Sequence, residues 1–130
     1  MNRFRLWRHM AGNHSATVAV IDDDAGVLDS LKFLLEVAGF KVKTYASAAA
    51  FLGNGVTRTA CLILDHHMPV MTGLELVSQL RTQGANVPVL LVTGSLSPAI
   101  AARATQLGIE KVLEKPLAED DLLSFVTAHR

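Results

Sequence analysis

Acidic, hydroxyl and amine side chains stand directly after short apolar runs of the 130-residue sequence. Asp22 and Asp23 follow the first run, and Asp65 follows a later one. Thr93 and Lys115 come after two further runs towards the end of the chain. A carboxylate nucleophile, carboxylates that hold a divalent cation, a hydroxyl and a lysine together suit the transfer of a phosphoryl group to an aspartate oxygen. The sequence therefore predicts a phosphoryl-transfer site, provided that the fold brings these side chains together.

The segments that must position these residues alternate between two periodicities. Short apolar or alternating runs predict five strands, at 17–21, 41–45, 61–64, 88–92 and 111–113. Apolar residues at helical spacing predict five helices, around 27–38, 46–52, 74–80, 100–107 and 122–126. Strands that alternate with helices predict an α/β fold, a doubly wound parallel sheet with helices on both faces.

The edge of the sheet where the strands end is the expected place of the site, because open α/β sheets bind ligands there. With strand order 2-1-3-4-5, strands 1 and 3 are neighbours about 4.8 Å apart, so that Asp22, Asp23 and Asp65 crowd together. Their mutual repulsion amounts to roughly several kcal/mol at an effective dielectric constant of about 20. A magnesium ion, which prefers oxygen ligands, relieves it. Lys115 starts two strands away, at ~10 Å, and its long side chain is needed to return to the site.

Composition limits the class of protein. Half of the residues are hydrophobic and 18% are charged, which argues against an intrinsically disordered chain. Twelve basic and twelve acidic side chains cancel, so direct binding of nucleic acid is not expected. The apolar runs are too short to span a membrane. The single cysteine, Cys61, is interpreted as a small buried apolar group and fits a reducing, cytoplasmic location.

Four segments resemble the response-regulator receiver domain of two-component signalling: Val20–Asp24, Leu64–Gly73, Leu91–Gly94 and Glu114–Pro116. All four in this order are far more specific than any one of them, and the match extends over about residues 17–128. The details are most similar to receivers of the nitrogen-fixation and nodulation regulators. The resemblance implies a flavodoxin-like fold, a five-stranded parallel sheet of order 2-1-3-4-5 with five helices, formed by residues 17–130.

The resemblance also implies the ligands of a magnesium site. Asp65 is expected to be the phosphoacceptor and a ligand. Asp23 is expected to bind Mg²⁺ directly, and Asp22 to support it largely through water. The main-chain carbonyl of His67 is expected to complete the set.

Two further residues acquire roles through the same resemblance. Thr93 is expected to be the switch hydroxyl that moves towards the phosphoryl group. Lys115 is expected to contact the phosphoryl oxygens, and its peptide bond to Pro116 to be cis. Receivers usually have Tyr or Phe three residues before this lysine, whereas this chain has Val112. The usual coupling through an inward-turning ring therefore cannot operate as such.

As a receiver, the chain is expected to be a signalling protein whose only activities are self-phosphorylation and slow autodephosphorylation. The expected donor is a sensor histidine kinase or a histidine phosphotransfer protein. No second domain is recognised, so output is expected through a downstream protein target, a homodimer or transfer to another histidine. A phosphorylation-independent docking module is one alternative, which Val112 keeps open. A magnesium-dependent phosphohydrolase with an aspartate nucleophile is another, although such enzymes usually carry an acid where this chain has His67.

Simpler interpretations of the same residues also exist. Asp22, Asp23 and Asp24 could cap a helix, which is the preferred interpretation for Asp24. His66 and His67 could bind a transition metal. Adjacent side chains in a loop tend to diverge, however, and no third nitrogen or sulfur ligand is visible nearby in the sequence.

Residues 1–16 contain three arginines and no acidic residue, and they are interpreted as an N-terminal extension. They could form a loose tail, or a docking arm or added helix that carries Phe4, Leu6 and Trp7.

Overall fold

A computed structural model describes residues 16–54 and 56–130 of the chain. Five parallel strands form one sheet in the order β2-β1-β3-β4-β5, which confirms the predicted fold class and strand order. The strands are β1 (Thr17–Ile21), β2 (Val42–Tyr45), β3 (Thr59–Asp65), β4 (Val89–Thr93) and β5 (Lys111–Glu114). The helices are α2 (Ala25–Val37), α3 (Ala48–Asn54), α4 (Gly73–Thr82), α5 (Pro98–Gln106) and α6 (Glu119–His129), and a 3₁₀ turn, η2 (Val56–Arg58), precedes β3.

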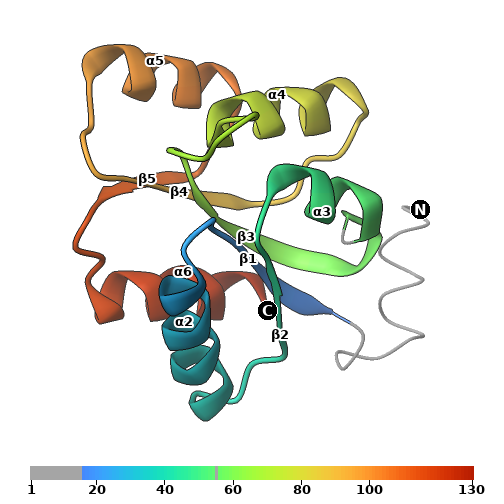
Figure 1. Cartoon of the computed structure of the whole chain (residues 1–130), viewed down its shortest axis with the longest axis vertical. Coiled ribbons are helices and arrows are strands. Elements are labelled where there is room, and N and C mark those ends of the chain that lie inside the picture. Colours follow the sequence, from blue (N-terminus) through green and yellow to red (C-terminus); the bar gives the residue numbers. More distant parts are fainter. Residues whose placement is uncertain (1–15, 55) are drawn as a thin grey trace.

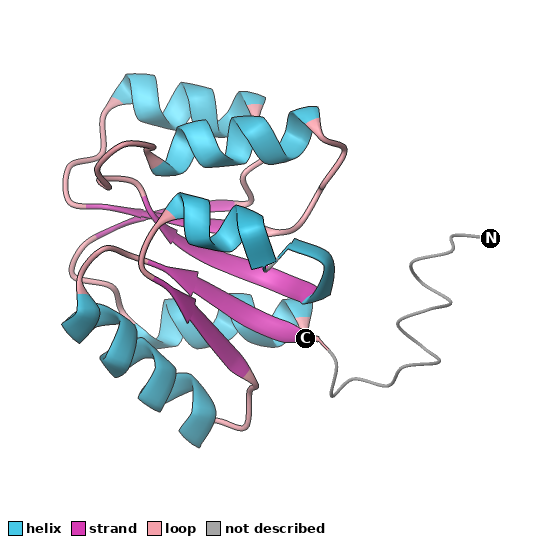
Figure 2. Ribbon diagram, turned by 45° about the vertical axis from the view of Figure 1, so that its right-hand side comes forward, coloured by secondary structure: helices cyan, strands magenta, loops and turns pink. Residues whose placement is uncertain are grey.

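The sheet lies between two layers of helices, with α3, α4 and α5 on one face and α2 and α6 on the other (Figures 1 and 2). Its central strands β1, β3 and β4 are buried along their whole length. Successive side chains of a strand point to opposite faces, so each strand contributes to two cores. Leu62 and Leu64 pack beneath the first layer, and Cys61 and Ile63 beneath the second. The continuous apolar run of β3 is therefore explained by its burial on both faces.

Polar residues fix where several helices begin. Asp24 Oδ1 accepts hydrogen bonds from Gly26 N (2.9 Å) and Val27 N (3.3 Å), which confirms Asp24 as the cap of α2. Thr72 and Glu75 form a reciprocal capping box at the start of α4. The beginning of each of these helices lies next to a loop that follows a strand, so the caps also position the loops.

The structure differs from the expected boundaries at the start of β3. The strand begins at Thr59 rather than Cys61, and Thr59 lies opposite Thr17 in the register with β1. Neither Thr59 nor Ala60 stands out in an apolar pattern, yet both are buried because the central strand is covered at this end too.

Gly73, the first residue of α4, packs against the end of β3. A Cβ atom at this position would lie 2.8 Å from the Asp65 carbonyl oxygen and 2.9 Å from His66 Cα. We expect Gly73→Ala to lower the free energy of unfolding by about 1–3 kcal/mol, because the backbone at the end of β3 and the Leu91 side chain must give way to the new methyl group. Urea denaturation measures this loss.

Gly53→Ala on α3 is the matched control, because nothing lies within 4 Å of the methyl group that it adds. This variant is expected to be unchanged or more stable by about 0.5–1 kcal/mol, as is usual for alanine in a helix. Equal effects of the two substitutions would show that the close contact at Gly73 is unimportant.

Two expectations from the sequence concern the N-terminal extension and membrane-spanning helices. Residues 1–15 of the predicted N-terminal extension, including Phe4, Leu6 and Trp7, lie outside the described residues, so the extension stays a prediction. Among residues 16–54 and 56–130, none of the helices has both the length and the apolar character that crossing a membrane requires.

Candidate functional site

The predicted site residues lie at the carboxyl edge of the sheet, and main-chain hydrogen bonds extend the sheet to hold them there. Asp22 follows β1, and its N–H donates to Tyr45 O of β2 (3.2 Å). Asp65 and Thr93 are the last residues of the neighbouring strands β3 and β4. Lys115 follows β5, and its N–H donates to Thr93 O (2.9 Å). The geometry of a parallel sheet thus brings residues that are far apart in the sequence to one edge.

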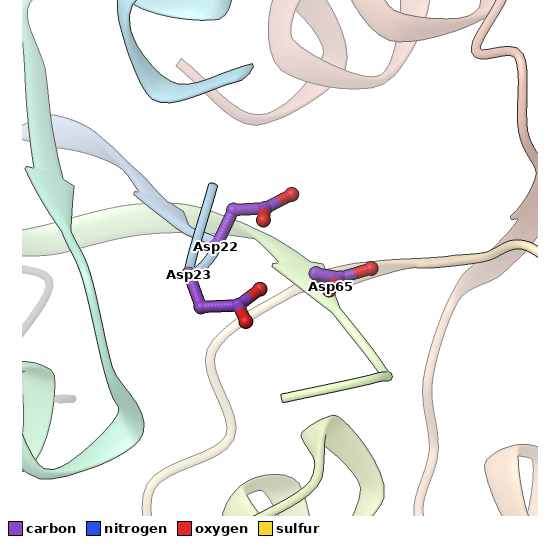
Figure 3. Close-up of side chains that lie close together, drawn as sticks. All are labelled: Asp22, Asp23 and Asp65. Atoms are coloured by element: carbon purple, nitrogen blue, oxygen red, sulfur yellow. The ribbon is translucent and has the colours of Figure 1, made fainter. Parts of the chain in front are cut away.

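Three carboxylates form a compact acidic group at this edge: Asp22, Asp23 and Asp65 each offer an oxygen, and all three oxygens lie within 4.8 Å of one another (Figure 3). Asp22 and Asp65 are only 4% exposed, whereas Asp23 is exposed. Asp22 is fixed by a hydrogen bond from Asp24 N to its Oδ1 (2.9 Å). The crowding of carboxylates expected from the strand order is therefore present.

Burial and like charge make this group unfavourable in the absence of a cation. Burial raises the pKa of Asp22, and repulsion from Asp65 and Asp23 raises it further, although the hydrogen bond from Asp24 N opposes the rise. Because the pKa of Asp22 is higher in the folded protein than in the unfolded chain, its negative charge at neutral pH destabilises the fold.

Lys115 brings a positive charge to Asp65 from the side of β5, whereas Asp22 and Asp23 lie on the side of β1. Its Nζ lies 3.0 Å from Asp65 Oδ1, so the side chain spans the distance from β5 as expected. Burial lowers the pKa of Lys115, but close contact with Asp65 and attraction to Asp22 and Asp23 outweigh this, and the net effect is a raised pKa. Lys115 is thus a cation at neutral pH. The Lys115–Pro116 peptide bond is cis, as the resemblance implied.

The donor set fits a magnesium ion. All three carboxylates offer hard oxygen atoms, which Mg²⁺ prefers. Asp65 Oδ1 is fully buried, yet it accepts no well-aligned hydrogen bond from any described residue; its contact with Lys115 is an ion pair. A buried carboxylate oxygen with unused acceptor capacity, beside two further carboxylates, is suited to a cation.

We expect Asp22→Asn to stabilise the ion-free protein by about 1–3 kcal/mol, because it removes one of three charges that repel at ~5 Å while keeping the oxygen that accepts from Asp24 N. The gain in stability that Mg²⁺ provides should become smaller in this variant. Urea denaturation in EDTA and in Mg²⁺ measures both effects.

Asp29→Asn is the matched control, because Asp29 is exposed on α2 and lies outside the acidic group. This substitution is expected to change stability by less than about 0.5 kcal/mol in either solution. A destabilised Asp22→Asn protein in EDTA would contradict the repulsion described above.

Thr93 makes a contact that the sequence did not reveal. The threonine is fully buried, and its Oγ1 lies 3.1 Å from Nε2 of His67, within hydrogen-bonding distance. Sequence analysis considered the His67 carbonyl as a magnesium ligand and the His67 imidazole as a transition-metal ligand, but it predicted no contact between this imidazole and Thr93. The only signal was its position, two residues after Asp65 in a loop that begins at the same sheet edge.

The histidine rings do not diverge as expected. The His66 and His67 ring centroids are 4.9 Å apart in an edge-to-face arrangement. Among residues 16–54 and 56–130, however, the acidic group is the one cluster with metal-ligand geometry, and it contains no histidine. The imidazole-metal hypothesis therefore receives no support.

Cys61 is buried as predicted, and Val112 lies in the strand that precedes Lys115. Cys61 is fully buried in the core, and burial raises the pKa of its thiol to about 12, so it is an unreactive apolar group. Val112 of β5 is half-buried and lies opposite Leu91 of β4, in the place where an aromatic ring is usual in receivers.

Comparison with known proteins places the chain in a family. The sequence model described as "Response regulator receiver domain" matches residues 18–127. The transcriptional regulatory protein FixJ of Azorhizobium caulinodans is 42% identical over 115 residues, which cover 88% of this chain and 54% of the relative. The response regulator protein TodT of Pseudomonas putida is 36% identical over 93% of this chain and 53% of the relative. The chain thus spans about half the length of the curated relatives it matches.

Solved structures show the same fold. The chemotaxis protein CheY4 of Vibrio cholerae superposes with a TM-score of 0.80 at 30% identity, over 88% of this chain and 98% of that one. Full-length FixJ from B. japonicum superposes with a TM-score of 0.77 at 37% identity, over 88% of this chain and 57% of that one. With its strand order, its acidic group and these matches in agreement, the chain belongs to the receiver domain family of the response regulators, the phosphoacceptor signalling domains of two-component systems.

Proposed function

We propose that this chain accepts a phosphoryl group on Asp65 from a phosphohistidine of a sensor histidine kinase or of a histidine phosphotransfer protein. A carboxylate oxygen of Asp65 attacks phosphorus, the phosphorus–nitrogen bond breaks, and the imidazole of the donor leaves. The product is an acyl phosphate on Asp65. The observation that carries the proposal is the position of Asp65: its carboxylate is buried, belongs to the acidic group and lies 3.0 Å from the Lys115 ammonium.

Asp22, Asp23, Asp65 and the main-chain carbonyl of His67 would hold the magnesium ion. When bound, this ion supplies positive charge that offsets the carboxylates and the oxygens of the incoming phosphoryl group. The buried Asp65 Oδ1 without a hydrogen bond and the mutual proximity of the three carboxylates support this assignment. Asp23 is exposed and is therefore accessible to a hydrated ion from solvent.

Lys115 and Thr93 would stabilise the phosphorylated state. The Lys115 ammonium can exchange its contact with Asp65 Oδ1 for the phosphoryl oxygens that form beside it. Thr93, at the end of the neighbouring strand, would donate its hydroxyl proton to one of these oxygens. Return to the resting state occurs when water attacks phosphorus and releases inorganic phosphate, which restores the carboxylate.

The partners follow from the same chemistry. Names of the relatives such as "transcriptional regulatory protein" are consistent with control of gene expression at the end of the pathway. For this chain we propose that phosphorylation changes its affinity for a protein target or for a second copy of itself. A cytoplasmic location, where a histidine kinase presents its phosphohistidine, stays a prediction.

Incubation with acetyl phosphate and Mg²⁺ tests the proposal. Intact-mass measurement is expected to show the addition of one phosphoryl group, and EDTA is expected to prevent it. A wild-type chain that stays unmodified both with acetyl phosphate and with a competent histidine kinase would support the docking-module alternative instead. Rapid, repeated hydrolysis of a free phosphate ester would identify a phosphohydrolase.

A further inference from the structure

The Thr93 hydroxyl has no free hydrogen-bonding capacity in this arrangement. Thr93 Oγ1 donates to Ser95 O (3.2 Å), accepts from Ser95 N (3.2 Å) and lies 3.1 Å from His67 Nε2. A hydroxyl group has one proton and two acceptor positions. All three are filled when the His67 ring donates from Nε2. To donate to a new acceptor, the hydroxyl must give up its bond to Ser95 O, and to move away it must also leave the His67 ring.

His67 approaches this hydroxyl from the β3–α4 loop, residues 66–72. The loop is fixed at its base, since Met68 N and Gly73 N both donate to His66 O, at 3.1 Å and 3.0 Å. The His67 residue is exposed, whereas Thr93 is fully buried. The imidazole thus links the buried threonine to the surface. It reaches Thr93 of β4 from the side of β3, whereas Val112, which stands in place of an aromatic residue, belongs to β5 on the other side of β4.

We propose that His67 is a positioning residue that holds Thr93 in the resting arrangement and opposes the movement of its hydroxyl towards a phosphoryl group on Asp65. Phosphorylation then breaks the bond between His67 and Thr93 and releases the imidazole. The inference rests on the proposed function of Asp65. It assigns the restraint on Thr93 to an individual side chain of this protein, and it predicts that loss of this side chain favours the active arrangement.

Binding of a stable phosphoryl analogue tests this restraint on Thr93. Beryllium fluoride with Mg²⁺ adds to a carboxylate oxygen and presents fluorine acceptors in place of phosphoryl oxygens. A net hydrogen bond between neutral groups changes an equilibrium by about two- to tenfold. We therefore expect His67→Leu to bind beryllium fluoride about two- to tenfold more tightly than the wild type at fixed Mg²⁺, as followed by amide shifts in NMR titrations. General damage to the site would weaken binding, so the direction of the change is diagnostic.

Three further variants isolate the contact. In a Thr93→Val background, His67→Leu is expected to have no effect on affinity, because the hydroxyl that His67 holds is absent. His67→Gln, whose amide can donate to Thr93, is expected to return the affinity towards that of the wild type. His66→Leu is the matched control, since the His66 ring accepts a weak contact from Leu74 N (3.4 Å) and makes no hydrogen bond with Thr93; it should not tighten binding.

The outcomes separate this inference from the function on which it rests. A wild-type chain that shows no magnesium-dependent binding of beryllium fluoride would overturn the proposed function and this inference together. A wild type that binds, combined with His67→Leu that binds equally or more weakly, would overturn the inference alone. Tighter binding that persists in the Thr93→Val background would also overturn it, because His67 would then act on another group.

Discussion

Replacement of Asp65 by Asn is expected to abolish the incorporation of a phosphoryl group from acetyl phosphate. An amide oxygen at this position is not nucleophilic enough to attack phosphorus, although it has nearly the same size and can still accept from Lys115. Because one of three crowded charges disappears, the variant should fold at least as stably as the wild type. Intact-mass measurement after incubation with acetyl phosphate and Mg²⁺ is expected to show the unmodified mass alone.

Asp24→Asn provides the control for this loss. Asp24 lies in the same acidic run as Asp22 and Asp23, but it caps α2, and asparagine caps helices equally well. This variant is expected to become phosphorylated like the wild type. A phosphoryl group that is still added stoichiometrically to the Asp65→Asn protein would show that another residue is the acceptor.

The second large effect is expected for Asp23→Ala. If Asp23 is a direct ligand of Mg²⁺, its loss removes several kcal/mol of charge stabilisation from the transferring phosphoryl group, which corresponds to a rate lower by about 100-fold or more. The rate of phosphorylation by acetyl phosphate, measured over a range of Mg²⁺ concentrations, should become almost independent of Mg²⁺ because the reaction itself is lost. Asp23 is exposed, so the folded structure should be retained, which urea denaturation can verify.

Asp29→Ala is a suitable control for this substitution. Asp29 is an exposed aspartate of α2 that does not belong to the acidic group, so its removal changes the net charge equally without removing a ligand. We expect phosphorylation of this variant within about twofold of the wild-type rate, because an exposed charge outside the site is largely screened. Full labelling of the Asp23→Ala protein with unchanged Mg²⁺ dependence would exclude Asp23 as a ligand.

Much of the fold could be predicted because its signals are local. Strand β1 was placed at its observed bounds, Thr17–Ile21, since a short apolar run ends abruptly in three aspartates. The start of β3 was missed by two residues, because Thr59 and Ala60 are buried by their position in the sheet and not by an apolar pattern of their own. The 3₁₀ turn η2 has no comparable pattern and was also missed.

The site shows the same division between local and non-local information. Asp22, Asp23, Asp65 and Lys115 were predicted from their positions after the strands, because parallel strands carry their carboxyl ends to one edge. The contact between His67 and Thr93 was not predicted, since it depends on how the β3–α4 loop folds back over the end of β4. The close packing of Gly73 on Asp65 was missed for the same reason.

The hydrogen bonds of the half-buried Arg81 are decided by the tertiary structure alone. Its guanidinium donates to Leu107 O (2.8 Å), Ala85 O (2.9 Å) and Val87 O (3.0 Å), and so joins the end of α4 to the end of α5 and to the segment before β4. In the sequence it is one of the two charged residues of α4, the other being Glu75. Its partners are main-chain carbonyls, which every residue carries and which no residue type reveals.

The sequence by itself determined which chemical groups stand at the ends of the strands, because apolar periodicity and the polar residues that interrupt it are properties of neighbouring residues. The tertiary structure decided which of these groups touch: Lys115 with Asp65 across the width of one strand, and His67 with Thr93 across a loop. Such contacts depend on the direction of each side chain and on the path of each loop. Both can change enough to separate the contacting atoms by several ångströms while the apolar periodicity of the sequence stays the same.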